Sequence, residues 1–461
     1  MTQAVLKHLE SDRDAALARL KSLLAIPSVS TNPDNKGDIE RAARWVADAL
    51  GQAGLIARVM PTKGHPVVLA TTPPESVENA QHAPRVMFYG HYDVQPPEPL
   101  EEWTTPPFEP TVRDGAIYAR GASDDKGQVS CFLEALRAWH AVHGKFPVHV
   151  TVLIEGEEEM GSVSLPAFLR EHRDELAADI VLISDTAMWD RDTPAITYGL
   201  RGLLYFDLQL HNANRDLHSG VYGGTLANPA TILPQVLARL WDEKHRITIP
   251  GFYDDVLPVS EEERRRWDAL GFKERKQFFD PIGVNTPFGE AGFTTLQRKW
   301  ARPACDINGL YGGYGGPGAK TVIPSFAGAK VSFRLAANQK ADAIGAAFEQ
   351  WLRAQDVHGC RWKITHLGGC DAVVLPYDSP HIAAAVRAME TSAGRKPVLM
   401  REGATIPVVA DFKNTLGADS LLVGFGLNDD RLHAPNEKFD LSCFELGCRT
   451  HAVLLAELAK V

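Results

Sequence analysis

The hydrophobic pattern of the N-terminal third alternates between short apolar runs and longer amphipathic segments. The apolar runs at residues 66–70, 85–89 and 148–154 are short and continuous, as expected for buried strands. Residues 38–53 and 127–143 instead place apolar side chains three and four positions apart, which is the spacing of a helix face. Strands that alternate with amphipathic helices predict an α/β sheet covered by helices on both faces.

The middle of the chain follows a different pattern. Residues 196–210 predict a strand with a Gly-Leu-Arg-Gly bend, and residues 327–335 predict a second strand followed by a helix at residues 341–355. A helix pattern at residues 229–241 begins at a proline, which suits the first turn of a helix. Residues 250–303 are irregular and rich in charged and aromatic side chains. We expect this stretch to form a smaller α+β unit inserted into the first domain.

The alternation of helix and strand returns near the C-terminus, where we expect a helix, a strand and a final helix at residues 382–393, 421–424 and 441–458. The expected domain organisation therefore has three segments. Residues 1–197 and 380–461 form one domain in two parts, and residues 198–379 form the inserted unit.

The bulk composition sets limits on the class of protein. A chain of 461 residues with 44% hydrophobic and 23% charged side chains exceeds one ordinary core, so two domains are expected. The net charge of −10 and the lack of a long basic run argue against nucleic acid or an anionic membrane as the main partner. No apolar stretch resembles a signal peptide or approaches the roughly 20 residues that span a bilayer. The six cysteines form no CxxC pair, so we expect reduced thiols and a cytoplasmic protein.

Residues with candidate chemistry lie mostly where an apolar run ends. His91 closely follows the run at residues 85–89, and Asp185 follows another apolar run. The carboxyl ends of strands in an α/β sheet are where functional groups converge. His91 is a suitable metal ligand, and Asp93 could fix the tautomer of its ring. Taken singly, each of these residues is also compatible with a structural role.

Two acidic clusters extend this pattern. Asp124 and Asp125 are adjacent carboxylates that repel each other unless a cation or hydrogen-bond donors are near. They suit either a solvated N-cap or a site in which Asp124 bridges two metal ions. Four glutamates within residues 155–159 suit either an acidic surface loop or a metal site. In a metal site, one of Glu158 and Glu159 binds a cation and the other accepts a proton from the attacking water.

His433 is a further candidate ligand far downstream. Together, two histidines and three acids suit a pair of zinc-like ions that share a bridging carboxylate. Two such ions, about 3.5–4 Å apart, activate a water and stabilise both the attacking and the departing atoms. A glycine-rich stretch at residues 313–321 approaches a phosphate-binding loop, but Ala319 separates its glycine from the lysine. We therefore expect no nucleotide there.

The motifs, taken in order, resemble the metallopeptidase family of carnosinase, cytosolic non-specific dipeptidase, acetylornithine deacetylase and succinyl-diaminopimelate desuccinylase. The resemblance is closest to the carnosinase and cytosolic dipeptidase branch, and it spans nearly the whole chain. It implies a di-metal exopeptidase fold, in which an α/β catalytic domain with a central mixed sheet is interrupted by a smaller α+β lid and dimerisation domain. The motifs are GHYDVQP (90–96), RGASDDKG (120–127), EGEEEMGS (155–162), DLHSGVYGG (216–224), KTVIP (320–324) and HAPNEK (433–438).

The resemblance also implies a set of metal ligands. His91 and Asp185 would bind one cation, Glu159 and His433 would bind the other, and Asp124 would bridge the two. Two divalent ions per chain are expected, zinc(II) first and manganese(II) as the alternative.

Further roles follow from the same resemblance. Asp93 would orient His91, and Glu158 would be the general base and acid. His218 resembles a histidine that reaches the active site of the partner subunit in a homodimer and stabilises the oxyanion there.

The implied substrate contacts are Thr321, Arg334 and Thr405. The planar fork of Arg334 suits the C-terminal carboxylate of a peptide. Ala404-Thr405 stands where the branch usually has Gly-Ser, which leaves the preferred dipeptide open. The expected function is metal-dependent hydrolysis of dipeptides. The alternatives are an N-acyl amino acid deacylase or carboxypeptidase on the same scaffold, and a non-catalytic binding protein that keeps the fold.

Overall fold

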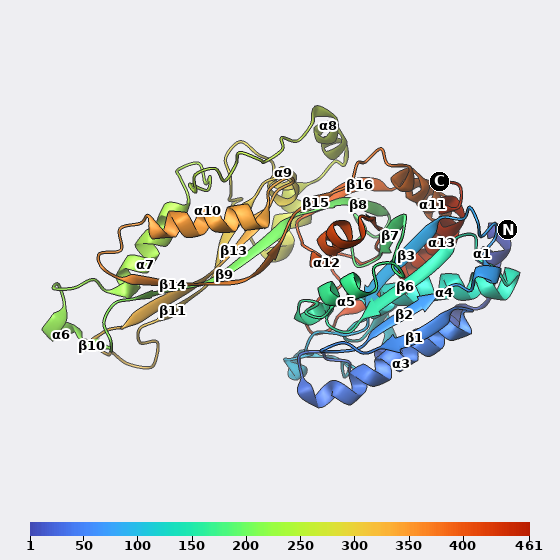
Figure 1. Ribbon diagram of the computed structural model, residues 1–461, viewed down its shortest axis with the longest axis horizontal. Helices are drawn as coiled ribbons and strands as arrows, with labels where there is room; N and C mark the ends of the chain where they lie inside the picture. The colour runs from blue at the N-terminus through green and yellow to red at the C-terminus, as the bar shows by residue number, and fades with distance from the viewer. The chain divides into compact units, whose positions relative to one another are not determined.

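The computed structural model describes residues 1–461, which form two compact units (Figure 1). Unit 1 consists of Met1–Tyr198, Leu375–Met400 and Asp411–Val461. Unit 2 consists of Gly199–Val374 and Arg401–Ala410. The chain therefore passes between the units four times, and each unit is described separately below.

Residues 401–410 belong to unit 2, although the hydrophobic pattern assigns them to the C-terminal part of the other domain. Hydrogen bonds within unit 2 explain the difference. Arg201 Nε donates to the carbonyl oxygen of Gly403 at 3.0 Å, and Thr405 Oγ1 donates to the carbonyl oxygen of Arg201 at 2.7 Å. Bonds between residues so distant in sequence leave no trace in local periodicity.

The centre of unit 1 is a mixed sheet whose strands run in the order β1-β2-β6-β3-β7-β17-β8. β3 is parallel to β6 and β7, and β17 is parallel to β7, whereas β2 is antiparallel to β1 and β6. The expected α/β fold with a mixed sheet is thus confirmed. The strands are β1 (Ile56–Met60), β2 (Val67–Thr71), β3 (Arg85–His91), β6 (His149–Glu155), β7 (Ile180–Ile183), β8 (Ala195–Leu200) and β17 (Asp419–Leu422), with a small separate sheet of β4 (Thr111–Arg113), β5 (Ala116–Tyr118) and β18 (Lys438–Asp440).

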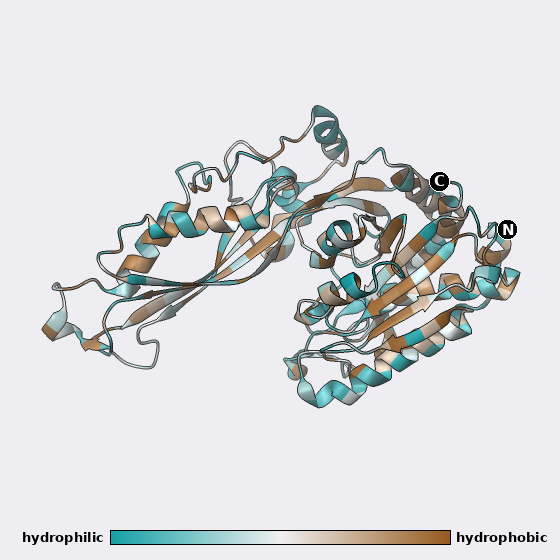
Figure 2. Ribbon diagram, viewed as in Figure 1, coloured by the Kyte–Doolittle hydropathy of each residue, from teal (hydrophilic) through white to brown (hydrophobic).

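The central strands of unit 1 are covered on both faces. β7 is buried along its length, and β3 is buried from Val86 to His91, which is typical of parallel strands between helix layers. α3 packs against β1 and β2, and α4 packs against β3 and α13. Figure 2 shows the strands mainly in hydrophobic colours and the outer face of α3 in hydrophilic colours. The helices are α1 (Thr2–Ser11), α2 (Arg13–Leu24), α3 (Lys36–Gln52), α4 (Lys126–His143), α5 (Leu165–Glu171), α11 (Pro380–Ala393) and α13 (Leu441–Leu458).

Unit 2 contains a four-stranded antiparallel sheet in the order β11-β13-β9-β14, against which α7 and α10 pack. The side chains of β9 alternate strictly between buried and half-buried, so one face of the sheet meets the helices. The rings of Phe206 and Phe333 both pack against Phe348, with centroids 5.1 and 4.8 Å away. The strands are β9 (Gly202–His211), β10 (Leu217–His218), β11 (Ala304–Gly312), β12 (Val322–Ile323), β13 (Phe326–Leu335), β14 (Arg361–Cys370) and β15 (Val373–Val374), and the helices are α6 (Ser219–Tyr222), α7 (Pro229–Leu237), α8 (Glu261–Ala269), α9 (Thr295–Trp300) and α10 (Ala341–Arg353).

Two short elements lie where the chain passes between the units, namely β16 (Val398–Glu402) and α12 (Pro407–Asp411). None of the helices combines the length and the apolar character that crossing a membrane requires.

A buried histidine in the core of unit 1 makes the stability of this unit dependent on pH. His451 on α13 is fully buried among the rings of Phe88, Phe132 and Phe425, at centroid distances of 5.9, 5.3 and 5.4 Å. Its Nε2 lies 2.8 Å from Ser184 Oγ. Burial lowers the pKa of His451 from 6.5 to about 3.

We expect the contribution of His451 to the free energy of unfolding to decline as the pH falls below 6.5. The unfolded chain takes up a proton at His451 that the folded chain excludes, so the stabilisation is complete above the unfolded pKa and declines towards the folded one. Between pH 7.5 and pH 5 the loss is about 2 kcal/mol. Between pH 7.5 and pH 5 the melting temperature of the unmodified protein should therefore fall relative to that of a His451→Gln variant, whose amide keeps a partner for Ser184 and does not titrate. Equal pH dependence in both proteins would contradict this assignment.

Candidate metal centre

The parallel strands of unit 1 bring the predicted site residues to one edge of the sheet. His91 is the last residue of β3, and its register partner Glu155 is the last residue of β6. A short 3₁₀ turn, η4 (Glu158–Met160), follows β6, and Asp185 follows β7. Asp124 lies two residues before the start of α4, whose N-cap is Asp125. This convergence is what the strand-end positions in the sequence predict.

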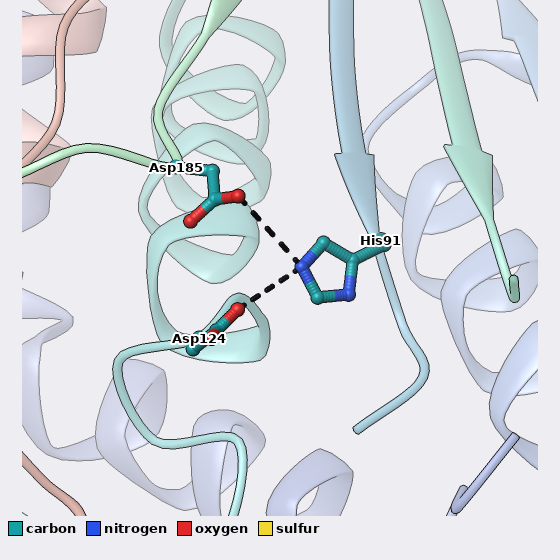
Figure 3. Close-up of side chains that lie close together, drawn as sticks. All are labelled: His91, Asp124 and Asp185. Carbon is teal, nitrogen blue, oxygen red and sulfur yellow. Dashed lines mark ion pairs between the residues drawn. The ribbon is translucent and has the colours of Figure 1, made fainter. Parts of the chain in front are cut away.

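The first candidate ligand group consists of His91, Asp124 and Asp185 (Figure 3). His91 Nε2 lies 3.2 Å from Asp124 Oδ1 and 4.0 Å from Asp185 Oδ2. Figure 3 shows both carboxylates turned towards the same ring nitrogen. His91 is fully buried, and Asp124 and Asp185 are largely buried. The group therefore gathers two acids and one histidine within the reach of a single cation.

The second group consists of Asp124, Glu159 and His433. His433 Nε2 lies 2.9 Å from Asp124 Oδ2 and 3.4 Å from Glu159 Oε2. Asp124 thus turns one carboxylate oxygen towards each group, which is the arrangement of a carboxylate shared by two cations. His433 has a φ of 59°, a left-handed conformation that is uncommon for a residue other than glycine. Such backbone conformations cluster at functional sites.

The ring of His91 is oriented by Asp93. His91 Nδ1 lies 3.1 Å from the carbonyl oxygen of Asp93, and because a carbonyl only accepts, Nδ1 carries the proton. The other ring nitrogen, Nε2, faces the carboxylates of Asp124 and Asp185. Burial favours the neutral ring, but Asp124 and then Asp93 outweigh it and raise the pKa of His91, so without a metal a proton on Nε2 balances the carboxylates. A cation between Nε2 and these oxygens would take the place of that proton. The donor set therefore fits a divalent metal ion.

The carboxylate of Asp93 holds the turn that carries the two candidate glutamates. It accepts hydrogen bonds from the backbone N–H of Glu158 at 3.3 Å and of Glu159 at 3.1 Å. Gln95 donates to the carboxylate of Glu159 at 2.8 Å. The expected contact of Asp93 with His91 is present, whereas the residue pattern did not indicate the contacts of Asp93 and Gln95 with the turn.

Burial and neighbouring charges shift the pKa values of the acids in the two ligand groups strongly. Burial, followed by the charge of Asp124, raises the pKa of Glu159 and of Asp185 to about 8. Hydrogen bonding to Asp124 raises the pKa of His433 to about 9. For Asp124, burial favours the neutral form, but hydrogen bonds with His433 and then His91 outweigh it and lower its pKa. Without cations, protons must balance the charge of this cluster, and metal binding would release them.

Glu158 lies beside these groups without belonging to either. It is half-buried at the start of η4, and burial raises the pKa of its carboxyl group. The charges of Asp124 and Asp93 act in the same direction. A carboxyl group whose pKa moves towards neutrality is suited to accept and return a proton.

Two of the predicted substrate residues adjoin each other on the small β10–β12 ladder of unit 2. His218 ends β10, and Thr321 directly precedes β12, whose Val322 is the register partner of His218. The backbone N–H of Ser219 donates to the carbonyl oxygen of Thr321 at 3.0 Å. His218 is exposed, and its Nδ1 accepts a hydrogen bond from the backbone N–H of Gly220 at 3.0 Å.

The other two predicted substrate residues contact each other elsewhere in unit 2. Arg334 on β13 donates through Nη1 to Thr405 Oγ1 at 2.7 Å, and Thr405 donates to the carbonyl oxygen of Arg201. Arg201 had no predicted role beyond its place in the Gly-Leu-Arg-Gly bend. Its contacts show that this bend anchors the segment that carries Thr405.

Comparison with known proteins agrees with this geometry. Residues 87–457 match the model of peptidase family M20/M25/M40, and the chain belongs to this family. It is 31% identical to the Beta-Ala-His dipeptidase of Homo sapiens, over 100% of this chain and 93% of that protein. It is 30% identical to the Cys-Gly metallodipeptidase DUG1 of Saccharomyces cerevisiae, over 98% of this chain and 97% of that protein. The solved metallo-carboxypeptidase Sso-CP2 from Sulfolobus solfataricus has a TM-score of 0.86 and 30% identity, and the match covers 97% of this chain and 99% of that one. The expected family is thereby confirmed.

Proposed function

We propose that the protein is a metallodipeptidase, which hydrolyses dipeptides with two divalent cations held by His91, Asp124, Glu159, Asp185 and His433. The main support is the position of Asp124, whose two carboxylate oxygens face two different groups of ligands. Imidazole and carboxylate donors suit zinc(II) first and manganese(II) as the alternative. Both curated relatives described above are named as dipeptidases, which favours dipeptides over N-acyl amino acids.

The residues around the cations have separate tasks in this proposal. Two divalent cations, when bound, would lower the pKa of a water and stabilise negative charge on the substrate. Glu158 would accept the proton of the attacking water and deliver it to the leaving nitrogen. Asp93 would keep His91 in the required tautomer and, through its bonds to the η4 backbone, keep Glu158 and Glu159 in place.

Unit 2 supplies the candidate substrate contacts. Arg334 would pair with the C-terminal carboxylate of the dipeptide, with Thr405 and Thr321 beside the substrate. His218 Nδ1 accepts a hydrogen bond, so Nε2 carries the proton and is a donor suited to an oxyanion. In a homodimer, His218 of one subunit would serve the metal centre of its partner. We also propose a cytoplasmic location, as the reduced cysteines suggest.

Hydrolysis of a substrate panel tests the proposed reaction. We expect the metal-loaded protein to cleave dipeptides faster than the corresponding N-acyl amino acids, and a chelator to abolish the activity until zinc or manganese is added back. Dipeptides with an amidated C-terminus are the matched control and should react more slowly, because Arg334 loses its carboxylate partner. Faster cleavage of N-acyl amino acids would support the deacylase alternative instead.

Mixing two inactive variants tests the proposed homodimer. In a heterodimer of His218→Ala and Glu158→Gln subunits, one of the two centres would combine the native Glu158 of one subunit with the native His218 of the other. With free exchange of subunits, an equal mixture should therefore recover about a quarter of the native activity. A mixture that stays as inactive as its components would contradict the role of His218 across the interface.

A further inference from the structure

Glu437 is a buried carboxylate that belongs to neither ligand group. It accepts a hydrogen bond from the backbone of Asp124, which is a candidate metal ligand. Its Oε1 accepts hydrogen bonds from the N–H groups of Ser123 at 3.0 Å and Asp124 at 3.1 Å. Its Oε2 accepts from the N–H of Gly121 at 3.0 Å and from Arg120 Nη1 at 2.7 Å. One side chain thereby fixes three peptide groups of the loop that ends in Asp124.

Arg120 extends this connection to the other loops of the metal centre. Its side chain, like that of Glu437, is only 1% exposed. Besides Glu437, the guanidinium donates to the carbonyl oxygens of Ala434 at 3.4 Å and Pro96 at 3.1 Å. Ala434 directly follows His433, and Pro96 lies in the loop after β3. The pair therefore connects the loop before α4, the loop before β18 and the loop after β3, all of which carry residues of the candidate centre.

Stability alone is a poor explanation for this ion pair. The desolvation of two buried charges offsets much of their attraction, and apolar replacements of such pairs are often neutral or stabilising. The hydrogen bonds of Glu437 are instead directed at the backbone of Asp124, the one residue common to both ligand groups. Residues that orient metal ligands without touching the metal change affinity by roughly 10–100-fold when they are replaced.

We propose that Glu437 and Arg120 are positioning residues of the metal centre. They set the place of the shared Asp124 carboxylate relative to His433 and so determine the affinity for both cations. This inference rests on the proposed two-metal function. Replacing either residue should weaken cation binding more at the group with Asp124, Glu159 and His433 than at the other group. The reason is that the loops of Asp124 and His433 both contact the Glu437–Arg120 pair.

Metal binding by a Glu437→Gln variant tests the inference. Glutamine keeps the size of the side chain, but it cannot accept all four hydrogen bonds and leaves the charge of Arg120 unpaired. We expect zinc affinity, measured by competition with a chromophoric chelator, to fall about 10–100-fold. We also expect the visible absorption spectrum of the cobalt(II)-substituted protein to change, since it reports the ligand geometry directly.

A second ion pair in unit 1, in which Glu134 is buried and Arg19 is half-buried, provides the control. Arg19 on α2 donates to the Glu134 carboxylate on α4 at 2.7 and 2.6 Å, and neither residue belongs to a ligand group. A Glu134→Gln variant should lower the melting temperature without changing zinc affinity or the cobalt spectrum. If Glu437→Gln does not fold, an Arg120→Met/Glu437→Gln double variant removes both charges and should show the same loss of zinc affinity.

Native zinc affinity and an unchanged cobalt spectrum in a folded Glu437→Gln or double variant would overturn the inference and leave the proposed function standing. Failure of the unmodified protein to bind either zinc(II) or manganese(II) would overturn both.

Discussion

A Glu158→Gln variant should retain both cations and lose most of its activity. Glutamine has the size of glutamate but cannot accept a proton, and general base catalysis of this kind contributes about 10²–10⁴-fold to the rate. Glu158 belongs to neither ligand group, and it reaches Asp93 through its backbone N–H, which the substitution preserves. We therefore expect kcat for a dipeptide to fall by about 10²–10⁴-fold while the metal content stays that of the unmodified protein.

The neighbouring glutamate gives the control for this experiment. Glu159 Oε2 faces His433 in the second ligand group, so Glu159→Gln should lower the metal content as well as kcat. The two variants differ in position by one residue and should differ in metal retention. A Glu158→Gln variant with near-native kcat, or one that loses its cations, would contradict the assigned role of Glu158.

An Asp124→Asn variant should lose both metal binding and activity. The amide offers one oxygen where the carboxylate offers two, so it can serve only one of the two groups. The loss of its negative charge also removes the main partner of His433 and of His91. We expect a loss of zinc affinity greater than the roughly 10–100-fold typical of residues that only support ligands. Equilibrium dialysis followed by metal analysis measures this directly.

Asp125 is the matched control for Asp124. It is fully buried next to Asp124, and one of its oxygens accepts the backbone N–H of His91 at 3.3 Å. Burial, followed by the charge of Asp185, raises the pKa of Asp125 and favours its uncharged form, which asparagine resembles. Asp125→Asn should therefore keep most of the zinc affinity. If both variants bound zinc equally well, Asp124 would not be the shared ligand.

The hydrophobic pattern predicted the part of the site that depends on the sheet. Apolar runs located β3, β6 and β7, and because parallel strands present their carboxyl ends at one edge, His91, Glu159 and Asp185 were expected to meet there. The position of His433 could not be predicted in this way. It lies in a loop with a left-handed backbone, and the buried contacts of Arg120 with that loop have no periodic signal.

Other elements were missed although local signals for them exist. Residues 250–303 were expected to be irregular, yet α8 and α9 form there. Each helix begins with a capping box, one formed by Ser260 with Glu263 and the other by Thr294 with Gln297. α8 buries little beyond Trp267, so it lacks the apolar stripe on which a periodicity analysis depends. Strand β1 was missed for a similar reason, since none of its side chains is buried.

The most direct test of the two-metal dipeptidase is a metal titration followed by its activity. Metal-free protein is titrated with zinc(II), and in parallel with manganese(II), while hydrolysis of a dipeptide is measured after each addition. The shared Asp124 carboxylate predicts that activity rises until two equivalents per chain are bound and then levels off. Full activity at one equivalent, or activity that persists without any metal, would contradict the two-metal centre.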